Sequence, residues 1–352
     1  TVNGAGNKTI DGGAGTDSLT ISVSGNTSLG SYAITTSGDY FVLTDANSNV
    51  IQYKNTESLT VGSYAYTHNT SEKTFWNSDE YVLYMYDGGR PDSITSLSGF
   101  SASANLSVIG SETSSANQYG AGDNSTNGDY LNLNIDRSSA LTGNLTLTMN
   151  AGDDLIDSAK FKNGDSVDMG AGNDTVSLML TGSNGTPALA SADLAKLDGG
   201  AGIDTLKFNE GGSFTGTLTL ETAGATNFEN IQGTSGAETI RGDANSNSLD
   251  GYSGGNDTLY GLGGDDYLYG QYAVGVDYVT HTSSYGPAGY QNADFYSNDV
   301  LYGGSGNDHL FGGGGDDILD GGTGTDTIYS GVGSDTIVLR VGDGGSTLAA
   351  AD

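Results

Sequence analysis

The stretch from residue 294 to residue 338 divides into five blocks of nine residues: DFYSNDVLY (294–302), GGSGNDHLF (303–311), GGGGDDILD (312–320), GGTGTDTIY (321–329) and SGVGSDTIV (330–338). The sixth residue of every block is aspartate, and the eighth is leucine or isoleucine. A fixed period of this kind predicts an architecture in which identical small units stack on one another.

The same phase continues upstream of this stretch. Two clear blocks, YSGGNDTLY (252–260) and GLGGDDYLY (261–269), follow two degenerate ones, GTSGAETIR (233–241) and GDANSNSLD (242–250). Gly251 stands between them as one extra residue. We therefore expect one array from 233 to 340, interrupted by an insertion at 270–293.

Each part of the block has a structural meaning. Glycines allow the tight, partly left-handed turn that residues with a Cβ resist. The last three residues form a short strand with one inward aliphatic side chain, which a nine-residue unit cannot bury alone. Successive units then form alternate edges of a parallel coil, and units two apart lie above one another at about 4.8 Å. The pattern predicts an all-β parallel β-helix or β-roll solenoid.

This stacking brings the sixth-position aspartates close together. Asp299, Asp317 and Asp335 fall on one edge, and Asp308 and Asp326 on the other. Two carboxylates about 5 Å apart repel by roughly 3 kcal/mol at an effective dielectric of about 20. Calcium accepts six to eight oxygen ligands in irregular geometry, so paired aspartates and turn carbonyls suit it better than they suit magnesium. We predict several calcium ions, bound by Asp257, Asp266, Asp299, Asp308, Asp317, Asp326 and Asp335.

The pattern G-G-x-G-x-D-x-U-x resembles the RTX (repeats-in-toxin) nonapeptide, and residues 227–251 look like the way many RTX arrays open. The resemblance implies a parallel β-roll, folding induced by calcium, and export from a Gram-negative cell by a type I secretion system. Glu238, Asn247 and Ser330 depart from the pattern, which weakens the calcium prediction at their turns.

Isolated copies of the block are scattered upstream, in a region that we take as residues 1–232. They are GGAGTDSLT (12–20), MNAGDDLID (149–157), MGAGNDTVS (169–177) and GGAGIDTLK (199–207), with a weaker echo at 87–95. Their sixth positions add four candidate calcium ligands: Asp17, Asp154, Asp174 and Asp204. Alternating strand-like segments between them predict a longer-rung β-helix or a β-sandwich-like region. Residues 341–352 form a tail.

Two segments interrupt these patterns. Residues 64–86 hold eight aromatic or histidine side chains, which either form the core of this region or present a carbohydrate-binding or protein-binding surface. The insertion 270–293 is rich in tyrosine and glycine and is expected to loop out between two rungs. Insertions in solenoids often lie on the binding face, so this one is either an interface or a plain surface loop.

Composition excludes several classes of protein. A net charge of −32 argues against nucleic acid and anionic membrane surfaces as partners. The absence of cysteine excludes disulfides, zinc fingers and a cysteine nucleophile, and no apolar run is long enough to span a membrane. Three separated histidines and a G-x-S-x-G match at Ser253, inside a glycine-rich turn, give no catalytic motif. We expect no enzyme activity.

The leading hypothesis is a secreted structural protein of a bacterial cell surface or matrix, of the surface-layer or adhesin kind. Its expected partners are calcium ions, further copies of itself and cell-surface glycans or proteins. One alternative is the accessory module of a larger secreted enzyme or toxin. Another is a calcium-dependent carbohydrate-binding or ice-binding adhesin module that uses residues such as Trp76.

Overall fold

The computed structural model describes residues 1–4, 6–26, 28–69, 73–86, 97–110, 128–133, 139–161, 164–180, 196–210, 214–222, 225–252, 254–270, 276–277, 282–283, 297–340 and 347–349. Within these ranges the regular structure is strand, apart from one 3-10 turn, η1 (Leu29–Ser31). The chain forms two compact units, the first of residues 1–157 and 164–174 and the second of residues 158–163 and 175–352. The all-β prediction is confirmed. The predicted boundary between the irregular region 1–232 and the array that begins at residue 233 is a different division, and it stays a prediction.

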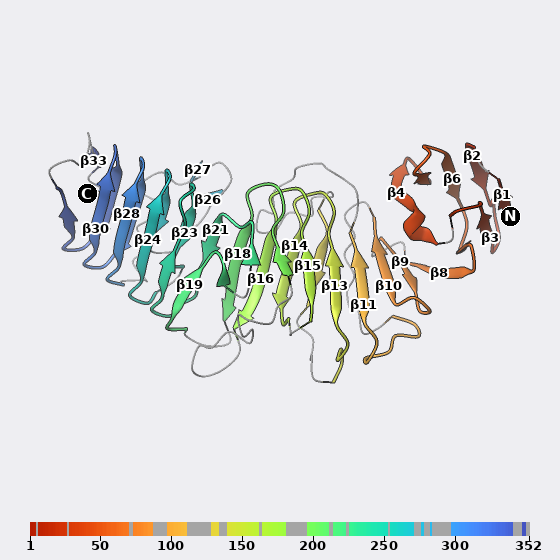
Figure 1. Cartoon of the computed structure of the whole chain (residues 1–352), viewed down its shortest axis with the longest axis horizontal. Helices are drawn as coiled ribbons and strands as arrows, with labels where there is room; N and C mark the ends of the chain where they lie inside the picture. Colours follow the sequence, from red (N-terminus) through yellow and green to blue (C-terminus); the bar gives the residue numbers. More distant parts are fainter. Residues whose placement is uncertain are drawn as a thin grey trace. The chain divides into compact units, whose positions relative to one another are not determined.

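The first unit combines antiparallel and parallel pairing (Figure 1). Its strands are β1 (Val2–Asn3), β2 (Lys8–Asp11), β3 (Ser18–Ser22), β4 (Tyr32–Ser37), β5 (Tyr40–Asp45), β6 (Val50–Lys54), β7 (Ser58–Val61), β8 (Tyr64–Asn69), β9 (Thr74–Asn77), β10 (Val82–Met85), β11 (Leu106–Ile109), β12 (Tyr130–Asn132), β13 (Leu145–Thr148), β15 (Ser166–Asp168) and the start of β14 (Leu155–Ala159). Strands β4 to β6 and β7 to β10 pair antiparallel with their neighbours. Strands β2 and β6, β3 and β7, and β10, β11, β13 and β15 pair parallel.

Aromatic side chains fill the core of the first unit. Tyr66, Phe75, Tyr84 and Tyr86 belong to a buried cluster with the aliphatic residues of β3, β5 and β7. Trp76 is 3% exposed, and its indole N–H donates to the carbonyl of Ser98 at 2.7 Å. The segment 64–86 is therefore a core, and the carbohydrate-binding use of Trp76 is wrong because the ring is covered.

The second unit is a parallel coil. Its strands are β16 (Thr175–Leu180), β17 (Lys196–Asp198), β18 (Thr205–Glu210), β19 (Thr217–Thr219), β20 (Ala225–Thr226), β21 (Asn230–Gln232), β22 (Thr239–Arg241), β23 (Ser248–Asp250), β24 (Thr258–Gly263), β25 (Tyr267–Tyr269), β26 (Val276–Asp277), β27 (Thr282–Ser283), β28 (Val300–Ser305), β29 (His309–Gly314), β30 (Ile318–Thr323), β31 (Thr327–Val332), β32 (Thr336–Val338) and β33 (Thr347–Ala349). One parallel sheet runs β19-β22-β24-β28-β30-β32, and a second includes β18-β21-β23-β25-β29-β31-β33. Successive strands of the array alternate between these two sheets, as the nine-residue period predicts.

The register of the coil follows the repeat. Val300 lies opposite Ile318 and His309 opposite Thr327, so paired residues are two blocks apart. The eighth-position side chains point inward, and all are 0–1% exposed from the first clear block to the block at 321: Leu259, Leu268, Leu301, Leu310, Leu319 and Ile328. Stacking rungs thus bury the aliphatic side chain that a single unit leaves open.

The structure corrects two details of the array. The N–H of Gly251 donates to the carbonyl of Tyr269 at 2.9 Å, as the first-position Gly242 does to Tyr260. Gly251 therefore occupies the first position of its rung, and the extra residue lies within the corner that follows. Gly270 takes the first position in the same way and donates to Phe311.

The insertion accordingly begins inside the corner of a single rung. Strand β24 remains paired with β28 across it, with Thr258 opposite Val300. The expectation that the insertion loops out between two rungs concerns residues outside the described ones and stays a prediction. Of the insertion, only Gly270, β26 and β27 are described, and β26 pairs antiparallel with β27.

Candidate metal centre

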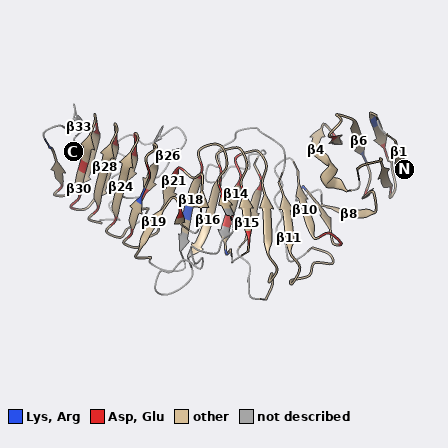
Figure 2. Ribbon diagram, in the orientation of Figure 1, with Lys and Arg blue, Asp and Glu red and all other residues tan. Residues whose placement is uncertain are grey.

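The sixth-position aspartates of the array form two columns, one along each corner of the coil. Figure 2 shows acidic residues along these bends. In the first column the backbone N–H of Asp257 donates to Oδ1 of Asp299 at 2.8 Å, Asp299 to Asp317 at 2.8 Å, and Asp317 to Asp335 at 3.1 Å. In the second, Asp266 donates to Asp308 at 2.8 Å and Asp308 to Asp326 at 3.1 Å. All seven predicted aspartates of the array are thus brought into two aligned sets.

The second carboxylate oxygen has a different environment. Oδ2 of Asp257, Asp266, Asp308 and Asp317 is buried and has no hydrogen-bond partner among the described residues. Each of these oxygens lies against the first-position glycine of its own rung, where a Cβ would collide with it. The glycine therefore makes room for the carboxylate, and a buried anionic oxygen without a donor is costly to maintain.

Burial raises the pKa of these carboxyl groups. Desolvation is the main cause, and it raises the pKa of Asp299 and Asp266 to about 8, opposed by backbone hydrogen bonds and reinforced by the next carboxylate in the column. The pKa of Asp317 rises to about 7 and that of Asp308 to about 6 for the same reason. The pKa of Asp257 is also raised by burial. Without a cation, the columns therefore hold protons that ordinary aspartates release.

Backbone carbonyls complete the set of oxygen donors. A Cβ on Gly324 would meet the carbonyl oxygen of Gly306, and one on Gly333 that of Gly315, so carbonyls of one corner face the corner above. These glycines have φ values of 135° and 152°, which side chains disfavour. Among the described residues no three His, Asp or Glu side chains gather as a metal site, so a site here must combine carboxylates with carbonyls. Orphaned carboxylate oxygens beside carbonyl oxygens fit calcium, a hard cation.

Two of the four isolated copies lie on one another in the first unit. The N–H of Asp154 donates to Oδ1 of Asp174 at 2.7 Å, and the N–H of Asp129 to Oδ1 of Asp154 at 2.7 Å. All three aspartates are 0% exposed, and burial raises the pKa of Asp154. This column repeats the arrangement of the array on a longer rung.

The other two copies stack on corners that lack glycine repeats. The N–H of Asp17 donates to Oε2 of Glu57 at 2.6 Å, and that of Asp204 to Oε2 of Glu229 at 2.8 Å. Asp17 and Asp204 therefore stack on glutamates, whereas the other nine predicted aspartates stack on further aspartates.

Sequence reasoning missed Asp129, Asp165, Glu57 and Glu229. Asp129 and Asp165 are 0% exposed, and Oδ1 of Asp165 accepts the N–H of Leu145 at 2.8 Å. All four precede a strand with an aliphatic residue two positions later, as in DYL, DSV, ESL and ENI. The sequence signal for these four residues is the second half of the nine-residue block alone: an acidic residue with an aliphatic residue two positions later, without the preceding glycines.

A second ladder runs outside the first. The fifth-position N–H of Asn307 donates to Oδ1 of Asp265 at 2.7 Å, and Thr325 donates to Asn307 at 3.0 Å. Along the other corner Asp316 donates to Asn298 at 2.8 Å and Ser334 to Asp316 at 2.8 Å. These exposed side chains align the corners without a buried charge.

Some predictions fall outside the described residues. They are the echo at 87–95, Ser253, His281 and most of the insertion. The described part of the chain has no helix long and apolar enough to cross a membrane.

Comparison with known families agrees with the geometry. The model of the RTX calcium-binding nonapeptide repeat matches four segments, residues 4–20, 232–268, 296–328 and 311–344. No curated protein matches the chain. The matched segments contain the corner at Asp17 and both aspartate columns of the array. The chain therefore carries RTX calcium-binding nonapeptide repeats, and the repeats of its array are wound into a parallel β-roll.

Proposed function

We propose that the protein is a secreted, non-enzymatic structural component of a bacterial cell surface or matrix, which folds and assembles when calcium binds. The observation that carries the proposal is the pair of aspartate columns, whose buried oxygens lack donors along most of the array. These columns run along the corners of the coil itself, so the proposed calcium sites are part of its repeating structure.

The chain's own residues supply a switch. Without a cation the stacked carboxyl groups of each column either take up protons or stay ionised, repel one another and resist burial. Bound calcium supplies the positive charge that neutralises them, and its binding free energy becomes folding free energy. Low calcium inside a cell and high calcium outside then keep the chain unfolded for export and fold it after release.

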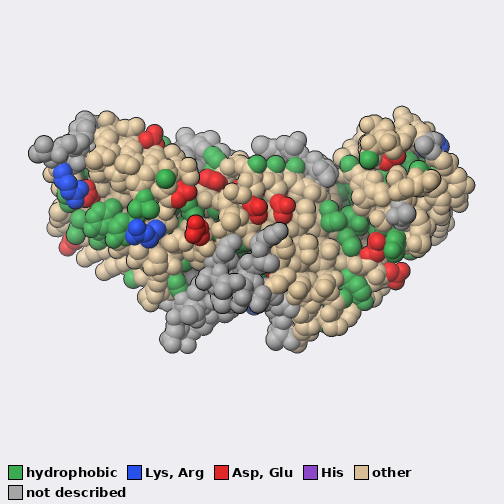
Figure 3. Space-filling model, in the orientation of Figure 1, with side chains coloured by type: hydrophobic (Ala, Val, Ile, Leu, Met, Phe, Trp, Pro, Cys, Tyr) green, Lys and Arg blue, Asp and Glu red, His purple; other side chains and the backbone are tan. Residues whose placement is uncertain are grey.

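One face of the roll supports self-association. Figure 3 shows hydrophobic side chains gathered over β24, β28 and β30. Tyr260 and Tyr302 stack with ring centroids 5.0 Å apart, and Ile318, opposite Val300 on the neighbouring strand β30, is 40% exposed. Arg241 lies 4.6 Å from the Tyr260 ring centroid. A flat apolar strip bordered by a cation suits repeated contacts between copies of a highly acidic chain.

The test is assembly in calcium, followed by electron microscopy and light scattering. We expect sheets or filaments with calcium and none with magnesium or a chelator. Ile318→Lys should abolish assembly and leave calcium-induced folding intact, whereas Thr327→Lys on the other sheet should assemble normally. A calcium-loaded, folded chain that stays monomeric at all concentrations would contradict the structural role and favour the accessory-module alternative.

A further inference from the structure

Two glycine-rich corners stack on a second, shorter kind of corner. Strand β2 leads to β3 through residues 12–17, and the rung paired with it passes from β6 to β7 through residues 55–57. Strand β17 leads to β18 through residues 199–204, and its partner passes from β20 to β21 through residues 227–229. The longer corners read GGAGTD and GGAGID, and the shorter ones NTE and NFE. The same pair of motifs thus occurs at two distant places.

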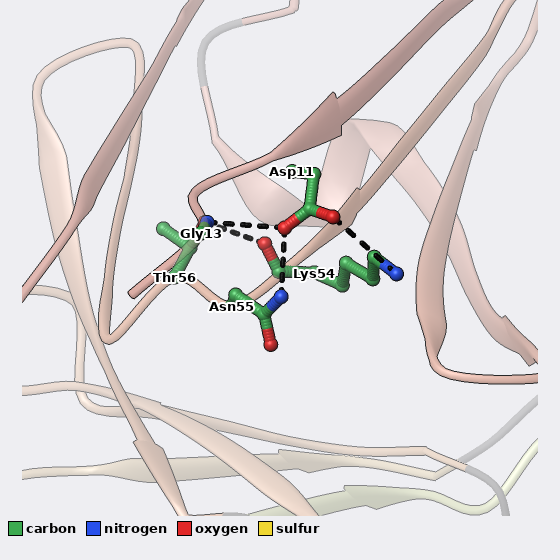
Figure 4. Close-up of polar contacts among 5 residues, drawn as sticks. All are labelled: Asp11, Gly13, Lys54, Asn55 and Thr56. Carbon is green, nitrogen blue, oxygen red and sulfur yellow. Dashed lines mark hydrogen bonds and ion pairs between the residues drawn. The ribbon is translucent and has the colours of Figure 1, made fainter. Parts of the chain in front are cut away.

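The asparagine of each short corner bridges the two rungs. Nδ2 of Asn55 donates to Oδ1 of Asp11 at 2.7 Å, and Nδ2 of Asn227 donates to Oδ1 of Asp198 at 2.7 Å. Asp11 and Asp198 come directly before the longer corners. Figure 4 shows the first copy, where the Asp11 carboxylate also accepts the N–H of Gly13 and pairs with Lys54. A side-chain amide thus donates across the rungs to a carboxylate.

The glutamate makes a second bridge. Each glutamate carboxylate accepts the N–H of the sixth-position aspartate in the longer corner, Asp17 or Asp204. In return the N–H of Glu57 donates to the carbonyl of Asp17 at 3.0 Å, and that of Glu229 to the carbonyl of Asp204 at 3.1 Å. Glutamate has one methylene more than aspartate. Its carboxylate can therefore reach, from a shorter corner, the backbone N–H that an aspartate carboxylate accepts in the array.

Asparagine suits this position for two reasons. Asn55 and Asn227 have φ values of 51° and 56°, in the left-handed region that asparagine tolerates better than most residues. The side chain also supplies N–H donors, which a carboxylate lacks. A short corner needs both properties, because it must turn sharply and link to its neighbour.

We propose that the Asn-x-Glu corners are calcium-independent clasps. In the array, two long corners face each other and offer carbonyls from both sides. In a clasp a three-residue corner faces the long one, and the asparagine and glutamate side chains link the two rungs directly. Oδ2 of Asp17 and Asp204 is buried as in the array, so a cation can still bind there, but these hydrogen bonds do not require it. Hydrogen bonds from the asparagine amide and to the glutamate carboxylate hold the rungs together there. The clasps keep the rungs at Asp17 and Asp204 folded before calcium binds and the array folds.

The test is hydrogen–deuterium exchange of the whole chain, read by mass spectrometry, in chelator and in calcium. In chelator, peptides covering 198–204 and 227–232 should stay protected while peptides covering 303–335 exchange freely. Loss of protection in both regions to the same extent would overturn the proposal.

Two variants test the asparagine itself. Asn227→Gly keeps the left-handed backbone and removes the amide, and it should raise exchange around 198–204 in chelator by about tenfold. Asn227→Asp places a second carboxylate against Asp198 and should make protection of this corner depend on calcium. Asn307→Gly, in the calcium array, is the matched control and should leave these peptides unchanged. Wild-type exchange in both Asn227 variants would contradict the clasp.

Discussion

At the scale of the residue, the sixth-position aspartate has two oxygens in unlike surroundings. Oδ1 of Asp317 accepts the N–H of Asp299 from the neighbouring rung, and Oδ2 is buried against glycine without a donor. The first oxygen aligns the rungs in any state of the site. The second is stable only when a proton or a cation reaches it, which makes the same side chain both a structural link and a switch.

The position of an aspartate in its column sets the cost of removing it. Asp317 is 1% exposed and has Asp299 and Asp335 on either side, whereas Asp335 is half-buried. Asp317→Ala should therefore destabilise the calcium-loaded protein by about 1–3 kcal/mol more than Asp335→Ala, because it strands a buried N–H and disrupts two stacked pairs. Thermal unfolding in saturating calcium measures the difference. Equal losses for the two variants would show that the column is not cooperative.

The raised pKa values predict that protons substitute for calcium. An unfolded aspartate has a pKa of about 3.9, whereas burial raises the pKa of Asp299 and Asp266 to about 8 in the calcium-free fold. The folded state then binds more protons than the unfolded state, so stability is full at the acid end and is lost as pH rises toward about 8.

We accordingly expect the calcium-free chain to gain β structure when the pH falls from about 8 to about 5, and calcium to bind more weakly there. Circular dichroism in chelator follows the first effect, and a calcium titration at each pH follows the second. Asp317→Asn, which mimics the protonated carboxyl as Asn247 does in its own rung, should be less sensitive to pH. A calcium-free chain that loses structure on acidification would contradict the cause given for the shifts.

At the scale of the element, the repeat predicts the strand, the inward residue and the register. The eighth-position aliphatics and the two-block offset follow from a period of nine, because rungs of equal length stack only in one way. The short corners at Asn55 and Asn227 are not predictable from that period. Their partners Asp11 and Asp198 lie 44 and 29 residues away along the chain, and longer rungs carry no fixed spacing.

The residue that begins each corner cannot be predicted from the sequence for a related reason. Gly251 fits equally well as an inserted residue or as the first position, and only its hydrogen bond to Tyr269 decides. The sequence likewise does not decide whether segment 64–86 forms a core or a surface, because aromatic residues occur in both. Its antiparallel pairing with β7 and β10 buries Phe75 and Tyr84.

At the scale of the whole molecule, the net charge of −32 has a specific arrangement. Seven of the acidic side chains lie in the two columns of the array, six of them 0–1% exposed, with Asp335 half-buried. Self-repulsion of this size opposes the compact state, so we expect the calcium-free coil to be unstable at neutral pH. Glycine-rich corners place carbonyl oxygens beside these carboxylates, which supports the proposal that the cation folds the roll.

The most direct test of this account is a calcium titration of the chelator-treated chain, followed by far-ultraviolet circular dichroism at neutral pH with magnesium as the control. We predict weak β signal without calcium, a cooperative gain as calcium is added, and little response to magnesium. A calcium-free chain that already shows the full β signal, unchanged by calcium, would contradict the central claim that the cation folds the roll.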